Sequence, residues 1–357
     1  MQKNAMFVCL NMENTKTAIS TKKIAILAIG MITSGFSYSQ SPSFRQQFTQ
    51  RINTNPALLG MSTYEGKDYA RLAATSRAQW MSLEGRLFTQ ALGYDGKLNN
   101  TRASIGGSVI ATDLYSGSGD NAKYSHFMGT LGYAYTLPAR KFNTQFGIAL
   151  QYSNYSFGSG RYTWSDQVDP NFTGFILPTQ EPMATIVRNA FHVSAGAMMY
   201  NKNFFFGGSV YNINQPDISI YPGSNMILKT KINIQGGFNI YSNIPGLVFT
   251  PHVYLMNQGS TAAGTVAVNV KIDNLQLGLG VQGSQFNDPI NNTKASNVGL
   301  TNYLGFHYGK LNFGYSIDWN LTYGNGQLPI THEISVGILT HQAAGKSQLH
   351  RVRLPEF

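Results

Sequence analysis

The residue pair best suited to catalysis is His192 and Ser194, because an imidazole can activate a serine hydroxyl when the two side chains meet. Positions two apart on a strand share one face. The alternation of polar and apolar residues around this pair places that face inside the protein. A pair that cleaves membrane lipid would instead have to face outward, toward the lipid. His126 and His252 have no acid or nucleophile at a recognisable spacing. We therefore expect no catalytic residues and no enzymatic activity.

Candidate metal ligands are equally sparse. Asp166 and Asp169 are close enough to suggest calcium, but two acids without a series of oxygen ligands do not make a site. The single cysteine, Cys9, and the dispersed histidines cannot supply a zinc site. The glycine-rich pieces at 117–119 and 158–160 precede no helix, so they do not indicate phosphate binding. The sequence predicts neither a metal nor a cofactor.

Arg77, Asp318 and Glu333 suggest a different chemistry, the pairing of charges inside the protein. A planar guanidinium can bind two carboxylates at once, and each of these residues lies on the polar face of a strand-like stretch. Arg77 can reach the other two only if the first and last strands are neighbours, as in a closed barrel. We predict that this seam charge cluster fastens the closing strands. The alternative is that its charges only line a water-filled lumen.

The stretch Leu311–Leu321 shows what kind of strand must carry these residues. Its odd positions are apolar and its even positions are small or polar over eleven residues. Soluble half-buried strands usually have about five or six residues, whereas a tilted span through hydrocarbon needs about ten. Taken alone, such a strand also suits a large soluble sandwich. The number of repeats decides between the two.

The pattern recurs about fourteen times along the chain. The spans are 69–80, 84–93, 101–111, 123–137, 142–155, 190–200, 203–212, 226–241, 246–257, 262–272, 274–286, 297–308, 310–322 and 331–341. Short turns follow the even-numbered spans and longer loops mostly follow the odd ones, as in outer-membrane barrels with tight periplasmic turns. The sequence therefore predicts an all-β fold, a transmembrane antiparallel β-barrel of about 14 strands over residues 69–341.

The composition agrees with a barrel and argues against nucleic-acid binding. The chain has 357 residues, 12% of them charged, with 37 Gly, 20 Tyr and 21 Phe. Such a chain is too weakly charged for disorder and too rich in glycine and aromatics for a helical bundle. The formal net charge is +10, but the basic residues are scattered singly rather than clustered. The expected surroundings are outer-membrane lipid.

Residues 1–39 read as a signal peptide. Lys22 and Lys23 precede an apolar run from Ile24 to about Ile32, and small residues follow, with cleavage expected near Ser39 or Gln40. The alternative is an N-terminal membrane anchor, for which the run is short. Either Met1 or Met12 can be the start. Removal of this segment would leave a mature chain without a thiol, located in the outer membrane.

Residues 40–68 form a leader that differs from the strands. Phe44, Phe48 and Ile52 recur every four residues, which predicts a short amphipathic helix ended by Asn55 and Pro56. An apolar stripe needs a surface to cover it, so we predict that the leader plugs the periplasmic mouth or the lumen. The alternative is a mobile periplasmic leader. Residues 342–357 would be a periplasmic C-terminal tail.

The longest loop, 156–189, carries Trp164, Phe172 and Phe175 among polar residues. Exposed aromatic side chains on a long loop suit contact with a partner. An equally good interpretation is that the loop folds inward and caps the lumen.

Several short motifs follow one another in a fixed order. They are Asn55-Pro56-Ala57 with Gly60, Arg77-Ala78-Gln79-Trp80, the block from Phe191 to Pro216, Thr331-His332-Glu333-Ile334-Ser335, and the closing Leu354-Pro355-Glu356-Phe357. In this order they resemble the PorP/SprF-type outer-membrane proteins of the type IX secretion system. The departures are Leu58-Leu59, where an aromatic and a small residue are commoner, and Glu356, where a basic or aromatic residue is usual. They concern the choice of partner more than membership.

The resemblance implies an accessory outer-membrane component of type IX secretion, the machinery that also serves gliding motility. Such a protein would bind, anchor or help deliver a cognate secreted surface protein, such as an adhesin, through the C-terminal sorting domain of that cargo. Other type IX secretion components are implied as further partners. A porin or hydrophobic-solute transporter is the alternative, because a leader plugging a lumen suits it as well. The identity of the cargo does not follow from the sequence.

Overall fold

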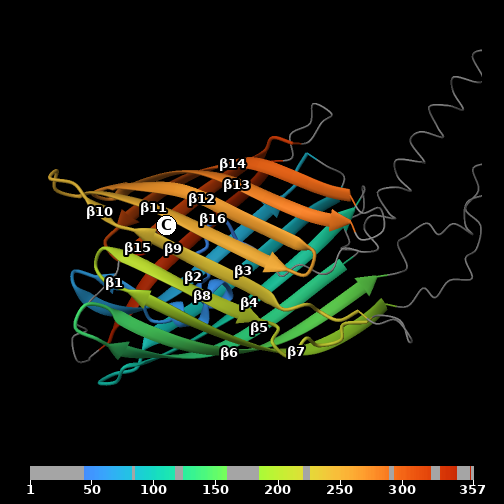
Figure 1. Ribbon diagram of the computed structural model, residues 1–357, viewed down its shortest axis with the longest axis horizontal. Helices are drawn as coiled ribbons and strands as arrows, with labels where there is room; N and C mark the ends of the chain where they lie inside the picture. The colour runs from blue at the N-terminus through green and yellow to red at the C-terminus, as the bar shows by residue number, and fades with distance from the viewer. Residues whose placement is uncertain are drawn as a thin grey trace, which may run out of the picture. The chain divides into compact units, whose positions relative to one another are not determined.

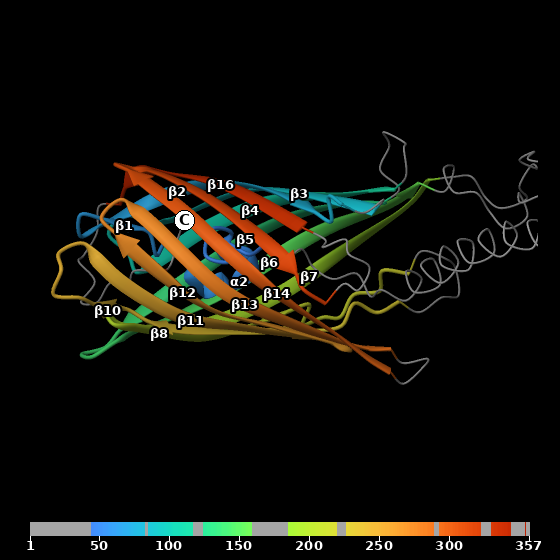
Figure 2. The ribbon, with the colours of Figure 1, turned by 90° about the horizontal axis from the view of Figure 1, so that it is seen from above.

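The computed structural model describes residues 44–82, 85–116, 124–158, 185–219, 226–288, 293–322, 330–343 and 354. They form one antiparallel sheet of sixteen strands, of which β1 (Thr63–Tyr64) and β10 (Ile240–Tyr241) have two residues each. The other fourteen make the wall (Figures 1 and 2). They are β2 (Lys67–Gln79), β3 (Gly85–Lys97), β4 (Ala103–Ser116), β5 (Tyr124–Pro138), β6 (Asn143–Gly158), β7 (Thr185–Tyr200), β8 (Phe204–Tyr211), β9 (Lys231–Phe238), β11 (Leu247–Gln258), β12 (Thr261–Ile272), β13 (Leu275–Asp288), β14 (Thr293–Tyr308), β15 (Leu311–Asn320) and β16 (Ile330–Gln342).

The sheet closes on itself, because β2 pairs with both β3 and β16. Every neighbouring pair in the wall is antiparallel, and each of the fourteen predicted spans coincides with one wall strand to within a few residues. The predicted fold class is therefore confirmed. Closure matters physically because it pairs the first wall strand with the last, so that neither presents its outer edge to a bilayer.

The two faces of the wall differ as the alternation predicts. On β15, Phe313 is 44% exposed on the outside while Asn312 is 8% exposed on the inside. Outward side chains elsewhere are mostly apolar, reaching 74% exposure at Leu131 on β5. Inward side chains are buried and more often polar, among them Thr75, Gln145 and Asn233. The outer face thus suits lipid, and the inner face carries the hydrogen-bonding groups.

Connections at the two ends of the barrel differ in length. At the end that we assign to the periplasm, turns such as Asp273-Asn274 and Gly309-Lys310 are tight. The opposite end carries the longest connections, although β11 and β12 are joined there by the two-residue turn Gly259-Ser260. Residues 159–184 lie outside the described residues, as do Trp164, Phe172 and Phe175 within them. The predicted signal peptide of residues 1–39 and most of the predicted tail of residues 342–357 also lie outside.

The leader lies inside the barrel, where α2 (Arg51–Thr54) is enclosed by the strands (Figure 2). The amphipathic helix predicted across Phe44, Phe48 and Ile52 is wrong in extent. Residues 45–50 are bends and turns, and only α2 and the 3₁₀ turn η1 (Pro56–Leu58) are helical. The apolar spacing arises instead from a folded segment that contacts several walls. In the described part of the chain, no helix is long and apolar enough to span a membrane.

Candidate functional site

The candidate site is the lumen together with the leader bound in it. Most of the leader has no regular secondary structure, so its buried peptide groups need partners from elsewhere. Wall side chains supply them. Its carbonyl oxygens accept hydrogen bonds from Tyr303 at Arg45 (3.1 Å), from Arg71 at Thr49 (2.8 Å), from Tyr211 at Ile52 (2.7 Å), from Ser209 and Asn233 at Thr54 (2.9 and 3.0 Å), and from Gln145 at Leu59 (2.7 Å). The inner wall therefore recognises the backbone of this segment.

A charged group fixes the leader on the β2–β3 side. Asp95 of β3 forms ion pairs with Arg51 of the leader at 2.8 Å and with Arg71 of β2 at 3.1 Å. Its carboxylate also accepts a hydrogen bond of 2.9 Å from the backbone N–H of Gly60. All three charged side chains are almost completely buried. We call Arg51, Arg71 and Asp95 the leader anchor. Burial makes these charges depend on one another.

The seam charge cluster lies across the strands that close the barrel. Arg77 on β2 and Glu333 on β16 are direct register partners, with Nη1 and Oε2 3.6 Å apart. The second guanidinium nitrogen of Arg77 is 3.7 Å from Asp318 on β15. The structure thus brings together the three residues that the sequence analysis grouped. Their role in fastening the seam remains a proposal.

Arg45 of the leader is a fourth member that the sequence analysis missed. Its Nε lies 2.7 Å from Asp318, and its backbone N–H donates a hydrogen bond of 2.8 Å to Glu333. Burial alone would lower the pKa of the Arg45 guanidinium, but the charge of Asp318 and the hydrogen bond to it outweigh burial and raise the pKa. The cluster therefore contains two cations and two anions, and it ties the leader to the seam.

The three apolar residues singled out in the leader are all buried in the lumen, at 6% exposure or less. They do not share one surface. Phe44 packs against Ala91, Ile110 and Met128; Ile52 and Leu59 pack against Ala134 and Ala149; Phe48 packs with Ala57, Leu58, Met61, Met198, Tyr200, Phe205 and Leu354. The leader therefore touches several walls at once, and Leu354 of the tail joins the same apolar group.

Asn55 and Pro56 fit against glycines of the wall. Asn55 starts η1, its Oδ1 accepting from the N–H of Ala57, while its Nδ2 donates to the carbonyls of Ala197 and Gly208. A Cβ on Gly147 would collide with the backbone of Pro56, and one on Gly196 would collide with Asn55. Close backbone approach of this kind requires glycine.

The same relation recurs along the wall. A Cβ on Gly93 would lie 2.9 Å from Gln50, one on Gly106 would lie 2.5 Å from Leu59, and one on Gly132 would lie 2.7 Å from Ile52. Together with Gly147 and Gly196, these residues point inward from β3, β4, β5, β6 and β7. We call these five residues the glycine footprint of the leader. In the sequence, their signal is a glycine on the polar face of a long strand, away from turns, which was not among the predicted site residues.

The histidines form no catalytic arrangement among the described residues. His192 and Ser194 both lie buried on the inner wall, as their parity predicted, and Ser194 donates to Gln151 at 3.0 Å. His126 stacks on Tyr155 with ring centroids 4.4 Å apart. Within the described ranges, no group of three or more His, Cys, Asp or Glu side chains could hold a metal ion. Asp166 and Asp169 lie outside these ranges.

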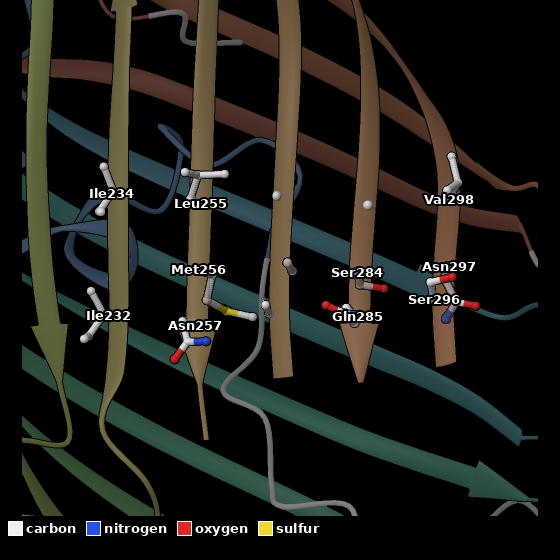
Figure 3. A pocket seen from close by; sticks show the side chains of 14 residues that line it. Ile232, Ile234, Leu255, Met256, Asn257, Ser284, Gln285, Ser296, Asn297 and Val298 are labelled. Atoms are coloured by element: carbon white, nitrogen blue, oxygen red, sulfur yellow. The ribbon is translucent and has the colours of Figure 1, made fainter. Parts of the chain in front are cut away.

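Two hollows remain. One, of about 520 Å³, lies at the periplasmic end between the β1 hairpin and strands β11 to β15, and it is lined by Asn269, His307 and Leu354 among others. The other, of about 510 Å³, lies on the wall formed by β9 and β11 to β14 (Figure 3). Ile232, Ile234 and Leu255 stand on one side of it and Val298 on the other, while small residues of β12 and β13 leave the space between. Its apolar surroundings suit lipid.

The model of a family described as type IX secretion system membrane protein PorP/SprF matches residues 36–338. No curated protein matches the chain. Among solved structures, the chain resembles the toluene transporter TodX of P. putida, with 11% identity over 81% of this chain and 93% of that chain and a TM-score of 0.48. It also resembles Omp33 of Acinetobacter baumannii, with 6% identity over 78% of this chain and 100% of that chain and a TM-score of 0.42. A third similar structure is a FadL homologue of Pseudomonas aeruginosa, with 12% identity over 80% of this chain and 93% of that chain and a TM-score of 0.42.

Proposed function

We propose, because this chain belongs to the PorP/SprF family of type IX secretion system membrane proteins, that its barrel binds one cognate secreted surface protein and helps to deliver or anchor it. The contact would be made through the C-terminal sorting domain of that secreted protein. The barrel itself would act as a receptor in the outer membrane rather than as a conduit.

The observation that carries this proposal is the way in which the leader occupies the lumen. A segment held by the leader anchor, the seam charge cluster and backbone hydrogen bonds from five wall strands is not easily displaced. Buried charges that depend on one another make partial withdrawal costly, because withdrawal would leave Asp95 or Asp318 with fewer partners. A filled lumen supports a binding role over free diffusion of solutes.

Deletion of the gene and pull-down with the barrel test the proposal together. Deletion should remove one secreted protein from the cell surface while other type IX substrates are still exported. The same protein should co-purify with the tagged barrel in detergent, and it should not co-purify with an unrelated outer-membrane barrel of similar abundance. Recovery of no secreted protein, combined with solute-driven swelling of liposomes that contain the purified barrel, would replace the receptor by the transporter.

A further inference from the structure

Strand β7 is paired unequally on its two sides. It pairs with β6 over its whole length, from Tyr200 opposite Asn143 to Thr185 opposite Gly158. With β8 it pairs only from Tyr200 to Ala195. The outer half of β7 therefore rises past the end of β8, as Figures 1 and 2 show. In the described part of the chain, no strand pairs with that half on the side of β8.

The chain after β8 leaves the wall and turns inward. Ile213 still donates to the carbonyl of Val193 at 3.0 Å, and the segment then folds so that Ile218 and Leu228 pack inside the barrel against Tyr155 and Ala190. The inward segment is held by the hydrogen bonds Ile218 N–H to Met226 O (2.9 Å) and Leu228 N–H to Pro216 O (3.0 Å). Its described residues pack against the inner wall instead of extending the sheet.

The direction of the edge groups follows from the groups that are bonded. Val193 donates its N–H to the Asn214 side chain at 3.1 Å, and the same side chain donates to the carbonyl of Phe191 at 2.7 Å. Backbone groups of alternate residues point the same way in an antiparallel strand. The N–H and C=O of Val187 and Asn189 therefore point out of the sheet edge, beyond the reach of the Asn214 cap.

Among the described residues, this unpaired edge lies at the end of the barrel opposite to the one that we assign to the periplasm. Tyr152 and Phe191 pack with ring centroids 5.2 Å apart on the outward face, where an aromatic girdle is expected. Beyond them toward the long loops the outward residues turn polar, and Asn154 donates to Asn189 at 2.6 Å on the exposed surface. Val187 is 53% exposed and Phe191 is 70% exposed. In the described part of the chain, the edge is thus bordered by exposed apolar side chains.

We propose that the outer half of β7, from Thr185 to Phe191, accepts an extended segment of the secreted partner as an added strand. An open edge of unpaired N–H and C=O groups is a template for another strand, and such pairing is a common mode of peptide recognition. The added strand needs alternating side chains, with apolar ones packing on the face of Val187 and Phe191. This inference rests on the proposed receptor function and names its docking site.

The test separates the backbone of one residue from its side chain. Val187→Pro removes the N–H that faces the edge, whereas Val187→Ala keeps the N–H and removes most of the side chain. Both variants are purified as full-length barrels, checked for the folded band in detergent gels, and mixed with the secreted protein that co-purifies with the wild type. We expect capture to fall at least tenfold with Val187→Pro and much less with Val187→Ala, which loses only part of the side-chain packing.

Two further measurements keep the proposal decidable if the proline variant does not fold. A photo-cross-linkable residue at Val187 should cross-link to the secreted protein, and one at Val298 on β14 should not. The amides of Val187 and Asn189 should exchange hydrogen rapidly in the isolated barrel and slowly in the complex. Slow exchange in the isolated barrel would overturn the proposal, because the chain itself or a second copy would then cover the edge.

Failure of docking at β7 and failure of the receptor function give different results. Equal capture by Val187→Pro and wild type, or cross-linking from Val298 alone, would refute docking at β7 while leaving the receptor function intact. A wild-type barrel that captures no secreted protein would refute the receptor function, and the docking site would fall with it.

Discussion

Arg77 and Glu333 face each other as direct register partners on the first and last wall strands, with side-chain nitrogen and oxygen 3.6 Å apart. Closure of the barrel thus brings a cation and an anion together inside the wall. Arg45 and Asp318 complete a neutral group of four around them. Because the leader contributes one of the four, barrel closure and leader docking share the same charges.

Replacing one member of this group should cost more than replacing a pair of opposite sign. Arg77→Met leaves Glu333 and Asp318 with Arg45 alone, and we expect it to lower the free energy of unfolding by about 3 kcal/mol. Arg77→Met combined with Glu333→Gln removes one charge of each sign and should cost less. The stability of each variant is measured as the urea concentration at which half of the barrel no longer migrates as the folded gel band. Additive losses would mean that these charges only line the lumen. A triple variant that also carries Asp318→Ala is unsuitable, because it would leave the Arg45 cation without an anion in the cluster.

The leader anchor allows a second test with a matched control. Asp95→Asn leaves Arg51 and Arg71 buried side by side without their shared anion, so we expect a loss of about 3–5 kcal/mol and a leader open to protease. Asp113→Asn, on neighbouring β4, changes a less buried carboxylate that accepts from Ser125, and it should cost about 1 kcal/mol or less. N-terminal sequencing of fragments after limited proteolysis reads out the leader. Similar sensitivity of the two variants would argue against the anchor.

The apolar contacts of the leader should matter separately from its charges. Replacing Phe44, Phe48 and Ile52 with Ser removes burial worth at most about 1.5–3 kcal/mol for each side chain. We expect cleavage within the leader while the barrel still migrates as a folded band. Leu98→Ser, at an exposed turn, is the control. Unchanged protection of the leader in the triple variant would show that the plug does not depend on these contacts.

The glycine footprint gives the sharpest comparison, because it changes one methyl group. Gly147→Ala places a methyl against the backbone of Pro56, whereas Gly129→Ala places one in open space. Overpacking typically costs about 1–3 kcal/mol. We expect Gly147→Ala to displace η1 and raise proteolysis near residue 56, and Gly129→Ala to leave both the leader and the melting temperature unchanged. Equal behaviour of the two variants would show that docking of the leader does not require glycine at position 147.

The wall could be predicted from the sequence because its information is local. A period of two fixes which residues face inward, and closure then makes the strands of Arg77 and Glu333 neighbours. The path of the leader has no such period. Arg45 and Asp95 acquire their partners only through the register of distant strands, and the unpaired half of β7 depends on where the chain after Tyr211 turns inward. A pattern of spans cannot express either relation.

The contacts of the leader also set an order on folding. The pairs between Arg51 and Asp95 span 44 residues of chain, whereas Arg45 and Glu333 are 288 residues apart. Short loops close at a lower entropic cost than long ones, so the first strands can gather around the leader long before the last strands arrive. The leader then serves as a template around which the wall forms. The final strands pair against a surface that is already in place. A barrel whose leader is cut after folding will therefore differ from one that never had it.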